Sequence, residues 1–396
     1  MRVAIIGQGY VGLTIAVGAA GAGHSVVGFD VNDSLVSSLN TGTSHIEGIT
    51  DASLAGFVAS GAYKASTDAS VLDGADVIVI AVPTPLDDKR NPDLSYVHDA
   101  AVLIANNVKT AALVINESTS YPGTLRKEIS ARITGVNHLY ASSPERVDPG
   151  NTEWSTKNTP RLIGGITPTA VAKAREFYAT FCDTIIEVSS PEVAEAAKIF
   201  ENTFRQVNIA LVNEFAQISD ALGISSREVI QAAGTKPYGF MEFNPGPGVG
   251  GHCIPVDPSY LAHVANQVGV PATFIKRANE VNLAMPAYVV KRVIEGFGNS
   301  IAGKSVLVVG VSYKANVADT RETPAAAVID VLRENGAKVV WHDDLVSSWR
   351  GESSAPMAAH DIAVVVTRHE EVSDAGIKAS GYVFDCTGTV SGVDGI

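Results

Sequence analysis

The sequence predicts an α/β protein in which two doubly wound domains are joined by a long central helix. Three observations support this fold class. Residues 3–30 read as strand, glycine turn, helix, strand and acid, and residues 305–344 repeat this order of elements. Residues 193–222 carry apolar side chains at spacings of three and four, which indicates one face of a helix. Because alternating strands and helices are typical of parallel sheets, we expect two Rossmann-like units and a helical centre.

The first unit opens with a short apolar run, Val3–Ile6, that leads into a glycine turn at residues 7–12. A second apolar run, Ser25–Phe29, ends at Asp30. Glycines in this context let a pyrophosphate approach the N-terminus of the following helix. Asp30 can accept hydrogen bonds from a ribose and repels a 2′-phosphate, so the pattern predicts NAD rather than NADP. The predicted cofactor contacts are Gly7, Gly9, Tyr10, Val11, Gly12 and Asp30.

Further buried strands are predicted at residues 77–82, 113–116 and 139–142. The first two are followed by polar segments, Pro83-Thr84-Pro85 and Glu117-Ser118-Thr119. Ligands of open α/β sheets bind at the carboxyl ends of the strands. We therefore add Pro83, Thr84 and Thr119 to the predicted cofactor contacts.

The central segment carries one apolar face over its whole length, formed by Val193, Ala197, Phe200, Phe204, Val207, Leu211, Phe215, Ile218 and Leu222. Such a helix extends beyond a single small domain, so we expect it to form the axis of a homodimer. Lys198, Asn202 and Arg205 form a separate polar stripe, offset by about one residue. This stripe is either a functional surface or an ordinary solvated helix face.

The most unusual segment is Pro245–Asp257, in which four glycines and three prolines surround the single thiol of Cys253. Glycine permits unusual backbone conformations, and proline fixes φ and removes donors. A stiff loop that presents one sulfur suits covalent catalysis by cysteine, with Asp257 four residues later. The alternative is a structural loop around a buried, inert cysteine.

The C-terminal unit repeats the pattern of the first, with strands at residues 305–309 and 337–342, a helix at 322–335 and an acid at Asp343. The glycine turn is replaced by residues 312–321, which include Lys314 and Arg321. These charges suit a nucleotide phosphate bound by side chains, although as plain surface charges they need no partner.

Composition limits the classes of function. The net charge of −13 argues against binding to nucleic acid or to an anionic membrane. Three widely separated cysteines, Cys182, Cys253 and Cys386, imply no disulfide framework and favour the cytoplasm. Cys182 and Cys386 are predicted core residues. We expect no membrane span and no metal site, and domains at residues 1–190, 191–295 and 296–396.

Six ordered motifs resemble the UDP-glucose/GDP-mannose dehydrogenase family of nucleotide-sugar 6-dehydrogenases. They are Gly7–Gly12, Glu117–Gly123, Ser143–Glu145, Ala197–Asn202, Gly250–Asp257 and Lys314–Arg321. The resemblance covers nearly the whole chain. It implies an NAD-binding N-terminal domain, a helical dimerisation domain with the cysteine loop, and a C-terminal domain that binds the UDP-sugar.

The resemblance also implies a four-electron oxidation at sugar C6 through a thiohemiacetal and a thioester on Cys253. Lys198 and Asn202 correspond to groups that stabilise the oxyanion, and Asp257 to the group that positions or deprotonates water. Glu145 and Thr119 correspond to water-handling and cofactor-side groups. Implied substrate contacts are Glu145, Arg146, Val147, Lys198, Asn202, Phe243, Asn244, Gly246, Gly250 and Lys314, and Arg321 is an implied cofactor contact.

One residue that differs from the usual pattern of the family narrows the choice of substrate. Val256 stands where UDP-glucose enzymes usually carry lysine. His252 and the segments Tyr238–Phe243 and Ser143–Gly150 resemble the UDP-N-acetylhexosamine branch, with UDP-N-acetylglucosamine preferred over UDP-N-acetylmannosamine or UDP-glucose. A two-electron 3-hydroxyacid dehydrogenase would leave Cys253 and the second unit without a role. A non-enzymatic sugar-nucleotide sensor would predict loss of Cys253 or Lys198, and both are present.

Overall fold

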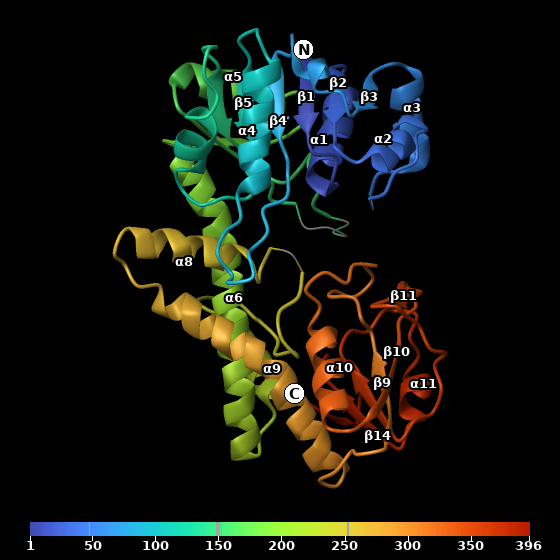
Figure 1. Cartoon of the computed structure of the whole chain (residues 1–396). Helices are drawn as coiled ribbons and strands as arrows, with labels where there is room; N and C mark the ends of the chain where they lie inside the picture. Colours follow the sequence, from blue (N-terminus) through green and yellow to red (C-terminus); the bar gives the residue numbers. More distant parts are fainter. Residues whose placement is uncertain (47, 148–150, 152, 252) are drawn as a thin grey trace. The chain divides into compact units, whose positions relative to one another are not determined.

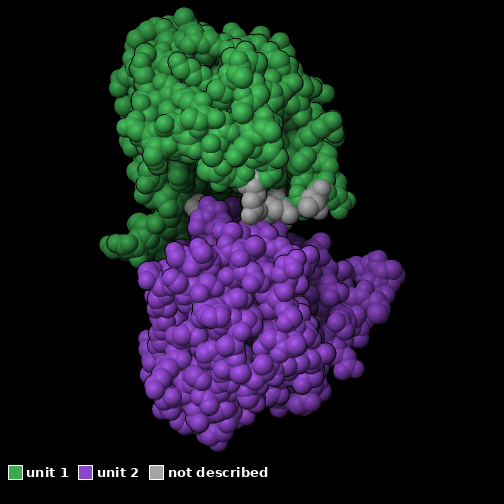
Figure 2. All heavy atoms as spheres, turned by 90° about the vertical axis from the view of Figure 1, so that its right-hand side faces the viewer, with its two compact units in different colours: residues 1–201, 259–269 green, residues 202–258, 270–396 purple. Residues whose placement is uncertain are grey.

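The structure, a computed structural model, describes the chain except for residues 47, 148–150, 152 and 252. The chain divides into two compact units, coloured separately in Figure 2: residues 1–201 with 259–269, and residues 202–258 with 270–396. The division falls inside the long helix α6 (Pro191–Leu222), so Lys198 belongs to the first unit and Asn202 to the second. Each unit is therefore described by itself.

The first unit contains an eight-stranded sheet with the order β3-β2-β1-β4-β5-β6-β7-β8 (Figure 1). Its strands are β1 (Arg2–Ile6), β2 (Ser25–Phe29), β3 (Tyr63–Ser66), β4 (Val77–Ile80), β5 (Leu113–Asn116), β6 (Leu139–Ser142), β7 (Arg161–Gly165) and β8 (Ile185–Glu187). All neighbours are parallel except β6 and β7. The first six strands have the Rossmann order, which confirms the predicted fold of this unit.

Helices cover this sheet and close its core. They are α1 (Tyr10–Gly21), α2 (Asp33–Asn40), α3 (Asp51–Ala59), α4 (Ser95–Asn107) and α5 (Pro168–Tyr178), with a 3₁₀ turn at Ala69–Leu72 and a π-helical turn at Leu125–Ser130. On one face, Val3 and Ile5 of β1 pack in a common core with Leu13 of α1 and Phe177 of α5. Alternation along the strand sends Ala4 and Ile6 to the opposite face, where they are also buried.

The glycine turn between β1 and α1 shows why its glycines differ. Gly7 has a φ of 90°, which favours glycine, and a Cβ on Gly12 would lie 1.9 Å from the carbonyl oxygen of Gly7. A Cβ on Gly9, by contrast, would meet no atom within 4 Å. Protein packing therefore requires Gly7 and Gly12, whereas Gly9 borders open space at the N-terminus of α1, where no side chain caps the helix.

The second unit contains a five-stranded parallel sheet with the order β10-β9-β13-β14-β15. Its strands are β9 (Ser305–Val309), β10 (Lys338–His342), β13 (Ile362–Val365), β14 (Tyr382–Asp385) and β15 (Asp394–Gly395), and β11 (Ser348–Trp349) with β12 (Glu352–Ser353) forms a small antiparallel pair. This is the other common doubly wound order, in which the strand order reverses between β9 and β13. The predicted repeat of the first unit is confirmed, with a different strand order.

Two helical layers enclose the second sheet. Val306 and Val308 of β9 face a core shared with α9 (Thr273–Phe297) and α10 (Pro324–Glu334). Leu307 and Val309 face the opposite core, which includes Ile377 of α11 (Asp374–Lys378). Helices α7 (Ser226–Gly234) and α8 (Asp257–Gln267) flank the cysteine loop in the sequence.

Helix α6 confirms the predicted long central helix (Figure 1). Part of its apolar side packs: Ala210 and Val207 contact Ala278 and Val281 of α9. Much of the predicted apolar face remains uncovered, and Leu211 has 62% of its surface exposed. Among the described helices, none combines the length and apolar character required to cross a bilayer.

The two glycines give a matched test of the turn. We expect Gly12→Ala to destabilise the fold by about 1–3 kcal/mol, because its Cβ overlaps backbone that cannot move freely. Gly9→Ala should change the free energy of unfolding by less than about 0.5 kcal/mol. Urea unfolding of both variants checks this, and equal losses in the two would contradict the described packing of the turn.

Candidate active-site residues

Asp30 lies beside the glycine turn, at the end of β2. Its Oδ2 accepts a hydrogen bond from the backbone N–H of Gln8 at 2.8 Å, and its Oδ1 accepts one from Asn32 at 3.0 Å. Gln8 is itself held by the hydroxyl of Tyr63, which donates to its Oε1 at 2.8 Å. The carboxylate is therefore fixed next to the open space at Gly9, an arrangement that fits the diphosphate and ribose of a dinucleotide.

The corresponding acid of the second unit, Asp343, is used differently. Its Oδ2 accepts the backbone N–H groups of Val311 and Ser312 at 2.8 and 3.1 Å, and its Oδ1 accepts His369 Nε2 at 3.0 Å. Burial works against ionisation, but these hydrogen bonds lower the pKa of Asp343. Asp343 is buried, whereas Asp30 is half-buried, so the acid of the second unit is less accessible to a ribose than the acid of the first.

The segments after β4 and β5 are joined by Ser118. Its hydroxyl accepts the N–H of Val82 and donates to the carbonyl of Val82, both at 2.9 Å. Thr84, buried, and Thr119, half-buried, follow these strands at the same sheet edge. Two predicted cofactor contacts are thereby placed on neighbouring, mutually anchored loops.

Glu145 is a fixed anion. Its Oε1 accepts the N–H groups of Arg146 and Val147 at 2.7 and 3.0 Å, and its Oε2 accepts Arg161 Nη2 at 2.7 Å. Burial opposes ionisation, but the charge of Arg161 and the two amides lower the pKa of Glu145. A carboxylate held in this way favours an anchoring role over proton transfer. Residues 148–150, which follow this segment, lie outside the described residues.

The start of α6 is tied to the segment after β5 by Glu195, a residue that sequence reasoning missed. Its carboxylate oxygens accept the N–H groups of Gly123 and Leu125 at 2.7 and 2.8 Å. Burial raises the pKa of Glu195 to about 8, although both donors work in the opposite direction. Lys198 is also buried and lies three residues further along this helix, so its position follows from that anchor. In the sequence, the anchoring role of Glu195 is indicated only by its position as an acidic residue one helical turn before Lys198.

In the second unit, the structure brings together three predicted residues. Asn202 Nδ2 donates to Asp257 Oδ2 at 2.5 Å, and the Asp257 N–H donates to the carbonyl of Cys253 at 2.8 Å. Cys253 is exposed, contrary to the alternative of a buried thiol, whereas Cys182 and Cys386 are buried as predicted. Burial raises the pKa of Cys182 to about 11, which makes that thiol unreactive at neutral pH. His252 lies outside the described residues.

Two glycines seat the cysteine loop on the segment of residues 313–321. A Cβ on Gly250 would lie 2.7 Å from Tyr313 Cβ, and the N–H of Gly251 donates to the Arg321 carbonyl at 3.1 Å. The Arg321 guanidinium pairs with Asp319 at 2.6 Å. The hydrogen bond from Arg321 to Asp319 raises the pKa of Arg321. No sequence signal pointed to Tyr313, although its neighbour Lys314 was predicted.

The beginning of the loop is anchored to α6 and α7. The N–H of Gly246 donates to Asn213 Oδ1 at 2.9 Å, and Arg227 Nη2 donates to the carbonyls of Pro245 and Cys386 at 3.1 and 2.8 Å. Of the other predicted substrate contacts, Phe243 packs edge-on against Phe204 with ring centroids 6.0 Å apart, and Asn244 is exposed.

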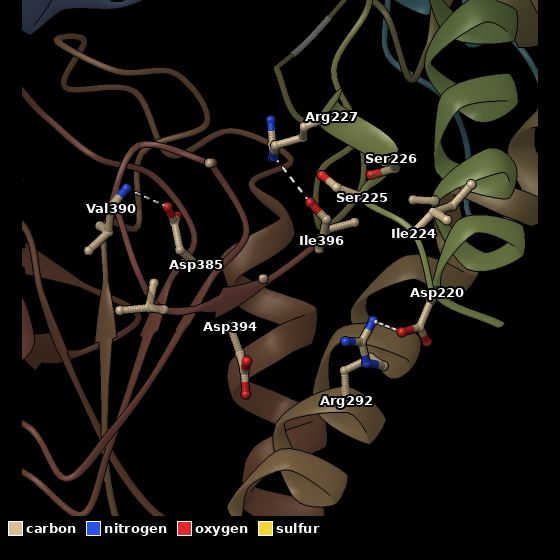
Figure 3. Close-up of a pocket in the computed structure, with 14 residues that line it drawn as sticks. Asp220, Ile224, Ser225, Ser226, Arg227, Arg292, Asp385, Val390, Asp394 and Ile396 are labelled. Carbon is tan, nitrogen blue, oxygen red and sulfur yellow. Dashed lines mark hydrogen bonds and ion pairs between the residues drawn. The ribbon is translucent and has the colours of Figure 1, made fainter. Parts of the chain in front are cut away.

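The second unit contains a cavity of about 320 Å³. Figure 3 shows the residues that line it, which come from α6, α7 and α9 and from the C-terminal sheet. Its two guanidinium groups have protein partners: Arg292 pairs with Asp220 at 2.7 Å, and Arg227 Nε donates to the Ile396 carbonyl at 3.1 Å. None of the predicted site residues lines it. Across the described part of the chain, no cluster of three or more acidic, His or Cys side chains could hold a metal ion.

Comparison with protein families finds one family along most of the chain. The UDP-glucose/GDP-mannose dehydrogenase family matches through its NAD binding domain at residues 1–182, its central domain at residues 192–284 and its UDP binding domain at residues 307–391.

Individual relatives match over most of the chain. UDP-N-acetyl-D-mannosamine dehydrogenase of Pyrococcus horikoshii is 34% identical over 391 residues, covering 96% of this chain and 92% of that enzyme. UDP-N-acetyl-D-glucosamine 6-dehydrogenase of Pseudomonas aeruginosa is 34% identical, covering 88% and 84%. The solved structure of the Pyrococcus horikoshii enzyme superposes with a TM-score of 0.90 at 32% identity, over 100% of this chain and 99% of that one. The chain therefore belongs to the UDP-glucose/GDP-mannose dehydrogenase family, as an NAD-dependent nucleotide-sugar dehydrogenase.

Proposed function

We propose that this chain oxidises the C6 hydroxymethyl group of a UDP-N-acetylhexosamine to the uronic acid, a precursor of surface polysaccharide, with UDP-N-acetylglucosamine as the preferred substrate. The observation that carries the proposal is the exposed Cys253 on a loop tied to Asn202 through Asp257. A two-electron dehydrogenase has no need of such a thiol. The described cysteines form no disulfide, which supports a cytoplasmic location, where thiols stay reduced.

The choice of sugar rests on a small number of residues. Val256 and the Gly-His-Cys-Ile-Pro segment with Phe240-Met241 favour the glucosamine compound within the N-acetylhexosamine branch. UDP-N-acetylmannosamine is the second candidate, favoured by the Pyrococcus horikoshii relative of that name. A few polar contacts to the sugar decide such discrimination.

NAD supplies the hydride acceptor, and we assign its binding to the glycine turn, Asp30, Pro83, Thr84, Thr119 and Arg321. C6 first loses a hydride and its hydroxyl loses a proton, which gives the aldehyde. The Cys253 thiolate then adds to the aldehyde carbon, and the carbonyl oxygen takes up a proton. Loss of a second hydride from that carbon, and of the proton from its oxygen, gives a thioester. Water then adds, the carbon–sulfur bond breaks, and Cys253 leaves as a thiolate while the carboxylate forms.

Each reaction step that develops negative charge on an oxygen atom requires a fixed protein group that stabilises this charge. Lys198 supplies a positive charge for the oxyanion, and Asn202, one turn further on α6, shares that oxygen. Asp257 positions the water and accepts its proton. We assign the UDP-sugar to Lys314, the segment of residues 145–147 and the loop residues Phe243, Asn244, Gly246 and Gly250.

We also propose that the active form is a homodimer built on α6. Phe200, Leu211 and Leu222 each leave more than 60% of their surface exposed on this helix. Exposed apolar residues gathered on one helix are typical of a protein interface.

The proposed function is tested by the yield of NADH per sugar. UDP-N-acetylglucosamine, UDP-N-acetylmannosamine, UDP-glucose and GDP-mannose are each consumed to completion with excess NAD. We expect two NADH per molecule of UDP-N-acetylglucosamine. Two NADH with another of these sugars would correct the substrate, and one NADH per sugar would overturn the four-electron reaction.

Removal of the thiol separates the two oxidations. We expect Cys253→Ala to bind NAD and the sugar nucleotide but to form uronate slower by about 10³-fold or more, the scale on which loss of a covalent nucleophile acts. Cys386→Ala removes a buried thiol and should leave the NADH yield at two. Uronate formation by Cys253→Ala at the normal rate would exclude the thioester.

The dimer is tested by placing charge on α6. Burial of a leucine-sized side chain contributes about 1.5–3 kcal/mol, so Leu211→Glu with Ile218→Glu should weaken association by about 100-fold or more. Ala172→Glu, on the exposed side of α5, adds acid to a different helix surface as a control. Light scattering after size exclusion gives the mass, and an unchanged dimer in the double variant would contradict the assigned interface.

A further inference from the structure

Five side chains form a buried cluster in the first unit, where β5, β6 and β7 lie side by side. We name it the Arg161 cluster; its members are Glu117, Glu145, Arg161, Tyr178 and Cys182. Arg161 Nη1 donates to Glu117 Oε1 at 2.8 Å and Nη2 donates to Glu145 Oε2 at 2.7 Å. The Arg161 guanidinium lies 4.5 Å from the centre of the Tyr178 ring, and the Tyr178 hydroxyl donates to Glu117 Oε1.

Two carboxylates thus share one guanidinium, and they differ in their remaining partners. Glu145 has two backbone N–H donors in addition to Arg161. Glu117 is fully buried, and its Oε2 has no hydrogen-bond partner among the residues described. Burial, opposed by the charge of Arg161, raises the pKa of Glu117 to about 7. Glu145 therefore carries the stable negative charge, and Glu117 exchanges a proton near neutral pH.

The other groups that face Arg161 do not titrate in that range. Burial raises the pKa of Tyr178 well above its usual value and that of Cys182 to about 11. Ionisation of Glu117 is consequently the one change of charge in the cluster between pH 6 and 8. An ionised Glu117 competes for the guanidinium and repels Glu145.

We propose that Arg161 is a positioning residue for residues 145–147, that it keeps the Glu145 carboxylate on the amides of Arg146 and Val147, and that protonation of Glu117 controls the strength of this hold. The inference rests on the proposed function in assigning residues 145–147 to the sugar nucleotide. The bidentate geometry explains why arginine is needed, since lysine cannot donate to both carboxylates from one planar group.

The hold is measured without substrate, by hydrogen exchange at the amides of Arg146 and Val147 in the full chain. Glu117 binds its proton more tightly folded than unfolded, so the hold is complete at low pH and weakens as pH rises through about 7. We expect the protection factors, corrected for intrinsic exchange, to fall about threefold to tenfold between pH 6 and 8. Glu117→Gln keeps an oxygen acceptor but cannot ionise, and it should abolish this dependence.

Activity supplies the second readout. Arg161→Lys should lower the protection of both amides and raise KM for the sugar nucleotide by about tenfold, with a smaller change in kcat. In the wild-type protein, the weaker hold at higher pH should raise KM for the sugar nucleotide between pH 6 and 8. Glu117→Gln should remove this rise and leave kcat unchanged. The matched control is Glu187→Gln, which removes an exposed pair with Arg175 in the same unit and should change neither quantity.

Each outcome decides the proposal. Unchanged amide protection in folded Arg161→Lys would overturn the positioning role, and an unchanged pH dependence in Glu117→Gln would overturn control by Glu117. If Arg161→Lys does not fold, the Glu117→Gln measurement still decides. If the wild-type protein oxidises no sugar nucleotide, the proposed function fails. The amide exchange measurement, which uses no substrate, then still tests the role of the Arg161 cluster.

Discussion

The hydrogen bond from Asn202 to Asp257 is the interaction on which the arrangement of the cysteine loop depends. It ties the residue that begins α8 to α6, and the Asp257 N–H in turn fixes the carbonyl of Cys253. Asn213, three turns further along α6, holds the start of the same loop through Gly246. A loop rich in glycine and proline has little side-chain packing of its own, so these two amides on one helix define its course together with the contacts to Arg227 and Arg321.

Buried carboxylates perform two opposite tasks in this protein. Glu145 and Asp343 are surrounded by donors and remain ionised, which fixes the backbone amides around them. Glu117 and Glu195 are buried with fewer compensating donors, and their pKa values rise to about 7 and 8. The first pair stabilises fixed turns, whereas burial brings the pKa values of the second pair close to neutral pH.

Local patterns predicted much of this architecture, because a strand followed by a glycine turn and a helix is encoded within about thirty residues. The strand Leu113–Asn116 and the long helix from residue 193 to residue 222 agree with the structure, while β4 ends at Ile80, two residues before the predicted end. The Arg161 cluster could not be predicted in this way, since sheet pairing brings together Glu117 and Arg161 from 44 residues apart. The contact of Tyr313 with the Gly250–Gly251 backbone likewise depends on tertiary packing alone.

In the proposed reaction, residue 253 becomes acylated during the second oxidation. The direct measurement is the intact mass of Cys253→Ser after reaction with UDP-N-acetylhexosamine and NAD. An oxygen ester releases its acyl group more slowly than a thioester, because the alkoxide is the poorer leaving group. We expect an acyl adduct at residue 253 with two NADH released per subunit. Full conversion to free uronate at the wild-type rate, with residue 253 unmodified throughout, would contradict it.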